Sequence, residues 1–131
     1  MKLPRTLTGI SSEFFVMAEL SRRGYNTTIT FGNTKAIDLL VEHKGKTIMV
    51  QVKGIQKTKS ICWNVSEDTL RSGLLFVFVN LHVDTMRPPE YFIMTNREVD
   101  KHLKRTNSGR NYIDYNYIKR LNVQDEWSKI K

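Results

Sequence analysis

The segment IDLLVEHKGKTIMVQVKG, residues 37–54, most restricts how this chain can fold. Lys44-Gly45 separates two runs rich in aliphatic residues, as in a β-hairpin with a two-residue turn. Such a turn fixes the register of both strands, because each residue then has one defined partner across the hairpin. In this register Asp38 lies opposite Gln51.

Side chains alternate between the two faces of a hairpin, and the two faces differ here. One face is entirely apolar and must be buried; it carries Ile37, Leu39, Val41, Ile48, Val50 and Val52. The other face gathers Asp38, Gln51 and Lys53 at the end far from the turn. The simplest interpretation of this second face is a solvated side of the sheet. However, Leu40 and Met49 also lie on it, which indicates partial cover.

A helix is predicted over residues 9–23, because GISSEFFVMAELSRR has helical periodicity and Gly24 follows as a C-cap. On a helical wheel, Glu13 falls inside a broad apolar arc that we expect to face the core. That arc consists of Ile10, Phe14, Val16, Met17, Ala18 and Leu20. A buried carboxylate needs a partner. Glu13 could satisfy free N–H groups of the first turn, but Ile10 three residues earlier does not fit a capping box.

Glu13, Asp38, Gln51 and Lys53 are therefore expected to converge on one point. Two carboxylates form a hard-oxygen site of the kind that Mg²⁺ or Mn²⁺ prefers. A neighbouring lysine can orient an attacking water and offset the charge of a phosphorane-like transition state. These groups are suited to metal-assisted hydrolysis of a phosphodiester.

This arrangement resembles the PD-(D/E)XK nuclease superfamily, which has the restriction-endonuclease-like fold. The resemblance rests on Glu13 in the first helix, Asp38 in the IDLL strand and QVK at residues 51–53. It covers roughly residues 8–105. It implies that Asp38 is the central metal ligand, that Lys53 is the catalytic lysine, and that Glu13 helps to hold the metal or its waters.

Gln51 departs from the commoner motif of that superfamily, which has Glu or Asp at this position. Some branches, including Mrr-like enzymes, carry Q-x-K. A glutamine carbonyl can still ligate a hard metal, with one negative charge fewer, so metal affinity should fall unless Glu13 compensates.

The whole chain predicts a single α/β domain over residues 1–131, with a mixed central sheet flanked by helices. The run LLFVFVN is apolar at both parities and predicts a buried strand at 74–80. A helix at 96–105 is predicted to begin with Asn96 as its N-cap. Trp127 is expected to dock in a last short helix near 123–130. Further strands are predicted at 25–31, 61–65 and 91–95.

The chain has 21 Lys and Arg against 13 Asp and Glu, a net charge of +8, which favours an anionic partner such as DNA. Phosphate contacts are predicted at Lys57 and Lys59, on the loop that leaves the hairpin, and at Lys35 before it. The single cysteine, Cys62, excludes an intrachain disulfide and agrees with a cytoplasmic protein. No apolar run is long enough to span a membrane, and no signal peptide is recognisable.

Three hypotheses follow. The first is a small metal-dependent endonuclease acting on DNA, in which a homodimer could cut both strands. The second is a nucleic-acid-binding domain of the same fold that no longer cleaves. The third is a structural or protein-interaction domain, in which Lys53 forms an internal salt bridge with Asp38 and Glu13. Mn²⁺ binding separates the first from the others, and salt-sensitive DNA binding separates the second from the third.

Overall fold

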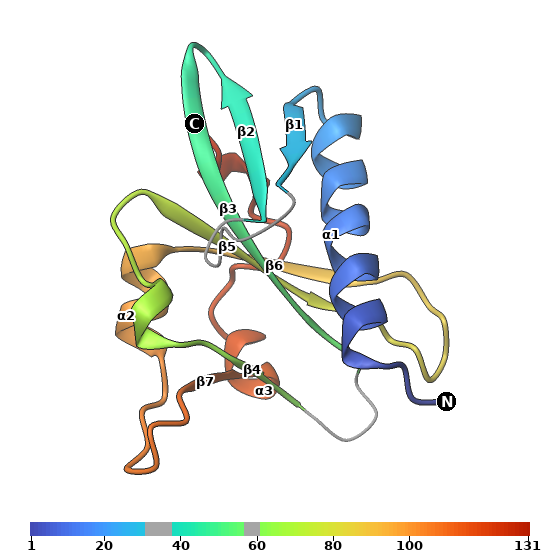
Figure 1. The fold of residues 1–131 in the computed structure, drawn as a ribbon, viewed down its shortest axis with the longest axis vertical. Helices are drawn as coiled ribbons and strands as arrows, with labels where there is room; N and C mark the ends of the chain where they lie inside the picture. The colour runs from blue at the N-terminus through green and yellow to red at the C-terminus, as the bar shows by residue number, and fades with distance from the viewer. Residues whose placement is uncertain (31–37, 57–60) are drawn as a thin grey trace.

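A computed structural model of the chain describes residues 1–30, 38–56 and 61–131. Its centre is a five-stranded sheet in the order β1-β2-β3-β5-β6 (Figure 1). The strands are β1 Asn26–Ile29, β2 Leu39–His43, β3 Lys46–Ile55, β5 Leu74–Asn80 and β6 Glu90–Thr95. β3 and β5 run parallel, whereas the other neighbouring strands are antiparallel. The predicted mixed sheet is therefore confirmed.

The sheet is covered on both faces, and each face buries its own apolar cluster. One face packs against α1 (Arg5–Arg22) and the short 3₁₀ helix η2 (Trp127–Lys129). The other face packs against α2 (Asn96–His102), α3 (Tyr115–Ile118) and a small sheet of β4 (Cys62–Asn64) and β7 (Tyr112–Asp114). A second 3₁₀ helix, η1 (Glu67–Thr69), lies between β4 and β5. β5 separates the clusters and is buried along its whole length, as predicted.

The β2–β3 hairpin has the predicted register. His43 pairs with Lys46 across a turn in which Lys44 and Gly45 have φ angles of 52° and 75°. Two consecutive positive φ angles are typical of a type I′ turn, which matches the twist of the flanking strands. Ile37 lies outside the described residues. The other members of the predicted apolar face are buried or half-buried in the cluster that α1 and η2 cover: Leu39, Val41, Ile48, Val50 and Val52.

The apolar arc predicted for the first helix is confirmed only in part, since Val16 and Leu20 are buried as expected. The side chains that α1 buries are Thr8, Ser12, Val16 and Leu20. Ile10 and Phe14, by contrast, are 46% and 55% exposed. The reason is a close approach at Gly54 of β3, where an added Cβ would lie 2.0 Å from the Ser12 hydroxyl oxygen. The Ser12 hydroxyl donates to the Thr8 carbonyl at 2.7 Å, so this small polar side chain is buried without losing its hydrogen bond.

Two other predictions need correction towards the C-terminus. The N-cap of α2 is Thr95 rather than Asn96, because Thr95 and Glu98 form a reciprocal capping box. The helix predicted at 96–105 already ends at His102. The strand predicted at 61–65 is present as β4 and pairs with β7, a strand that was not predicted. The last short helix is confirmed as η2, and Trp127 is only 4% exposed. No helix in the described ranges combines the length and hydrophobicity needed to cross a membrane.

Candidate active site

Asp38 stands just before β2 and is held by both neighbouring strands. Its backbone N–H donates to the Val50 carbonyl at 2.9 Å, and its carbonyl accepts from the Thr30 N–H at 2.9 Å. Its side-chain Oδ2 accepts from the Val52 N–H at 2.8 Å and from Gln51 Nε2 at 2.9 Å. These bonds fix the carboxylate beside β3, and among the described residues none forms a hydrogen bond with its other oxygen.

Gln51 is 5% exposed and has an incompletely satisfied amide group. Its Nε2 is used by Asp38, but its Oε1 is a buried acceptor with no partner among the described residues. Leaving a buried acceptor unpaired is costly, so such a group calls for an explanation. An amide oxygen next to a carboxylate is a suitable ligand for a hard cation.

Glu13 approaches from α1 as a second carboxylate. Partial burial raises the pKa of Glu13, and the nearby Asp38 charge raises it further. Burial also raises the pKa of Asp38, by more than the Val52 hydrogen bond and the Lys53 charge lower it. The Lys53 charge near Asp38 therefore does not outweigh the effect of burial on these two carboxylates, and a bound cation would favour their charged forms.

Lys53 lies two residues after Gln51, so both side chains leave β3 on the same face. Burial lowers the pKa of the Lys53 ammonium, and the Asp38 charge offsets only part of that effect. Lys53 forms no ion pair within 4.0 Å of either carboxylate in the described residues. The internal salt bridge expected under the third hypothesis is therefore not formed in this part of the chain.

The donor set fits a divalent cation through its oxygen chemistry. Among the described residues, no group of three or more His, Cys, Asp or Glu side chains could hold a metal ion. The candidate site instead combines the carboxylates of Glu13 and Asp38 with the unpaired amide oxygen of Gln51. All three are hard oxygen donors of the kind that Mg²⁺ and Mn²⁺ accept.

The structure describes positively charged residues near this site in addition to the predicted ones. Lys35, Lys57 and Lys59 lie outside the described residues, so their phosphate contacts stay predictions. A cleft of about 760 Å³ opens beside Lys53 between the N-terminal segment, β3 and β4. Lys2 and Arg5 line it, and neither residue was predicted from the sequence as a phosphate contact.

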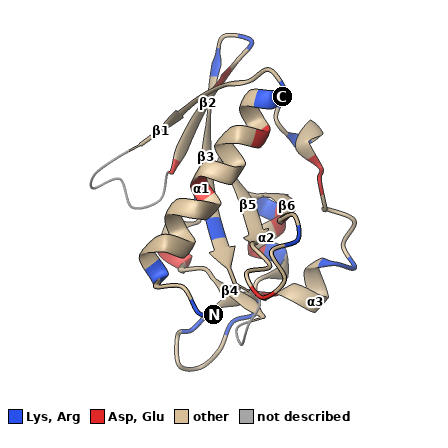
Figure 2. Ribbon diagram, turned by 90° about the vertical axis from the view of Figure 1, so that its right-hand side faces the viewer, with Lys and Arg blue, Asp and Glu red and all other residues tan. Residues whose placement is uncertain are grey.

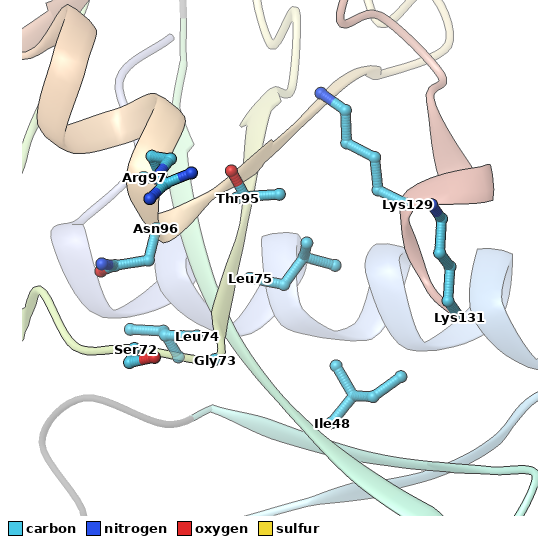
Figure 3. Close-up of a pocket in the computed structure, with 10 residues that line it drawn as sticks. All are labelled: Ile48, Ser72, Gly73, Leu74, Leu75, Thr95, Asn96, Arg97, Lys129 and Lys131. Carbon is cyan, nitrogen blue, oxygen red and sulfur yellow. The ribbon is translucent and has the colours of Figure 1, made fainter.

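A second cavity of about 450 Å³ lies near Leu74, the first residue of β5, and the start of α2 (Figure 3). One of its lining residues, Ile48, is five positions before Lys53 on β3, a separation of about 17 Å along an extended strand. The Lys129 ammonium at this cavity is already paired with Glu98 at 3.0 Å. This cavity is therefore separate from the candidate site.

A buried polar cluster also lies away from the site, where β6 begins. His82 is 1% exposed, and its Nε2 lies 2.5 Å from a Glu90 carboxylate oxygen that also accepts from the Tyr115 hydroxyl. Burial raises the pKa of Glu90, but these hydrogen bonds and neighbouring charges outweigh it and leave the pKa below its ordinary value. With its histidine enclosed, the cluster is suited to holding the 81–89 connection in place.

Comparison with solved structures gives a counterpart for the fold. A bacterial homing endonuclease, I-Ssp6803I, matches with a TM-score of 0.63 and 12% sequence identity, over 86% of this chain and 77% of its own. At this level of identity the match establishes a shared fold. No protein-family model matches the sequence, and a search of the curated proteins finds no similar sequence.

Proposed function

We propose that this protein is a metal-dependent endonuclease that hydrolyses phosphodiester bonds in DNA, and that it is a QxK variant of the PD-(D/E)XK superfamily. The observation that carries the proposal is the Asp38 carboxylate, fixed by the Val52 N–H beside the unpaired oxygen of Gln51. Glu13 adds a second carboxylate, whose pKa is raised by burial, and Lys53 adds an ammonium, whose pKa is lowered by burial. The fold shared with a homing endonuclease and the net charge of +8 support DNA as the substrate.

Each side chain has a distinct role in this proposal. Asp38, Glu13 and Gln51 Oε1 would hold Mg²⁺ or Mn²⁺, which when bound supplies Lewis-acid stabilisation of the charge on the phosphate. Lys53 donates hydrogen bonds to the attacking water and to the phosphate oxygens, and its charge stabilises the transition state.

The direct test uses the wild-type chain on linear duplex, single-stranded and branched DNA and on RNA. We expect cleavage of DNA with Mg²⁺ or Mn²⁺ and none with EDTA, together with Mn²⁺ binding measured by calorimetry. Salt-sensitive DNA binding without cleavage or Mn²⁺ binding would instead support an inactive nucleic-acid-binding domain. If the chain neither binds Mn²⁺, nor cleaves DNA, nor binds DNA, the remaining hypothesis is a structural or protein-interaction domain.

We also propose that two copies pair through the outer side of α1, bringing two sites to the two DNA strands. Leu7, Ile10 and Phe14 are exposed there by 47%, 46% and 55%. The only charged residues between positions 6 and 21 are Glu13 and Glu19, and neither lies on this side. Figures 1 and 2 show no other element over the outer side of α1. An apolar helix face without charge suits a second copy better than it suits phosphate.

Phe14→Glu is expected to shift the protein from dimer to monomer, because it places a charge in the apolar contact. Light scattering at micromolar concentration measures the change. Met86→Glu, at an apolar position that is 65% exposed in the 81–89 connection, is the matched control and should leave the mass unchanged. A wild-type chain that is already monomeric would contradict the pairing and leave the proposed chemistry unaffected.

A further inference from the structure

The cleft beside Lys53 has a positively charged wall with no role in the proposed chemistry. The wall is formed by the N-terminal segment and the start of α1, facing β3 and β4. The charged side chains among its described lining residues are Lys2, Arg5 and Lys53, with no Asp or Glu. The charged side chains that line this cleft in the described residues are therefore all positive, and one of them, Lys53, belongs to the candidate active site.

Gln56 holds this N-terminal segment in place. Its Oε1 accepts from the Leu3 N–H at 2.7 Å, and its Nε2 donates to the Leu3 carbonyl at 2.8 Å. The same Nε2 also donates to the Thr8 hydroxyl at 2.9 Å. One side chain thus pairs with the Leu3 backbone as a neighbouring strand would. Lys2 and Arg5, which are exposed on either side of Leu3, are positioned by this anchor.

The first turn of α1 adds further positive potential at the same place. Pro4, Arg5 and Thr8 line the cleft. The helix follows Pro4 as its N-cap, with no capping side chain and no acidic residue in its first turn. The free N–H groups of a helix start and the positive end of its dipole favour a phosphate. They add to the cationic side chains and would not define a site by themselves.

We propose that this cleft binds the nucleic-acid backbone next to the scissile phosphate, with Lys2 and Arg5 as phosphate contacts. The inference rests on the proposed nuclease function, since Lys53 lines the inner part of the same cleft. Trp63 also lines it, but its ring is 1% exposed and its Nε1 donates to the Val79 carbonyl at 3.0 Å, so it is not free to stack on a base. The cleft therefore contributes affinity for phosphate and little sequence preference.

The test is the double charge reversal Lys2→Glu with Arg5→Glu, measured by fluorescence anisotropy on duplex DNA without metal. We expect affinity to fall about 10- to 100-fold and the slope of log affinity against log salt to decrease by about 2, one per lost phosphate contact. Lys44→Glu with Lys46→Glu makes the same charge change at the hairpin turn, at the opposite end of the molecule from the N-terminus (Figure 1). This control should keep a clearly steeper slope and tighter binding than the cleft variant.

Gln56→Ala provides a second variant with no charge change. It should reproduce part of the loss in affinity, because the segment that carries Lys2 and Arg5 loses its anchor. Equal affinity and slope in the cleft variant and the control would overturn the inference, while wild-type cleavage with metal would still support the proposed function. If wild type shows neither metal-dependent cleavage nor salt-dependent DNA binding, both proposals fail.

Discussion

Asp38→Asn is expected to lower metal-dependent DNA cleavage by on the order of 1,000-fold, the size of effect seen when one key electrostatic group is removed from a preorganised site. Asparagine retains an oxygen that can accept from the Val52 N–H and from Gln51 Nε2, so the local hydrogen bonds can survive. It removes the negative charge that a divalent cation requires. Because it also removes one of two mutually repelling carboxylates, thermal stability should be unchanged or slightly higher.

The measurement combines cleavage rates in Mn²⁺ with calorimetric Mn²⁺ binding and a thermal melt. Asp68→Asn makes the same chemical change at an exposed position in η1 and is expected to leave all three unchanged. If Asp38→Asn cleaves DNA at the wild-type rate, Asp38 is not the central ligand and the assignment of this site is wrong.

Gly54→Ala is expected to destabilise the fold by about 1–3 kcal/mol or more, the usual cost of forcing extra volume into a packed interior. The new Cβ would lie 2.0 Å from Ser12 Oγ and 2.9 Å from Ser12 Cβ, so α1 has to move away from β3. Glu13 is the next residue of that helix, so cleavage should fall together with stability. Chemical denaturation and the cleavage assay measure the two effects.

Ser12→Gly in the same chain should restore part of the stability, because it removes both atoms that the new methyl group meets. Gly9→Ala is the matched control on α1. Its Cβ would meet only a Glu13 oxygen at 3.8 Å, so it should stabilise the helix by roughly 0.5–1 kcal/mol. Equal stability in Gly54→Ala and wild type would refute the close packing described here.

The hairpin could be predicted from the sequence because its determinants are local. A two-residue turn and a strict alternation of side chains fix which residues face each other, and the structure has that register. The pairing of Asp38 with Gln51 follows from it, as does the burial of the opposite face. The long buried strand β5 could be predicted for a similar reason, since its apolar run has no polar interruption before Asn80.

The orientation of α1 could not be predicted, because it depends on a contact between residues far apart in the chain. Nothing near Ser12 indicates that Gly54 of β3 will make room for it, so hydrophobicity alone assigned Ile10 and Phe14 to the buried side, although both are exposed. The cleft could not be predicted for the same reason, because it also depends on a contact between residues far apart in the chain. Gln56 binds Leu3 across 53 positions, and no local pattern connects these two residues.

The bond between Asp38 and the Val52 N–H has a consequence for how folding and activity are linked. The last residue pair of β2 and β3 is Leu39 with Val50, so the Val52 amide lies beyond the end of the β2–β3 pairing and is bonded by a side chain instead. A slip of the hairpin by one residue would remove that partner and move the carboxylate to the other face. Hydrogen exchange at this single amide is therefore expected to report whether the candidate site is assembled, even when the rest of the sheet is intact.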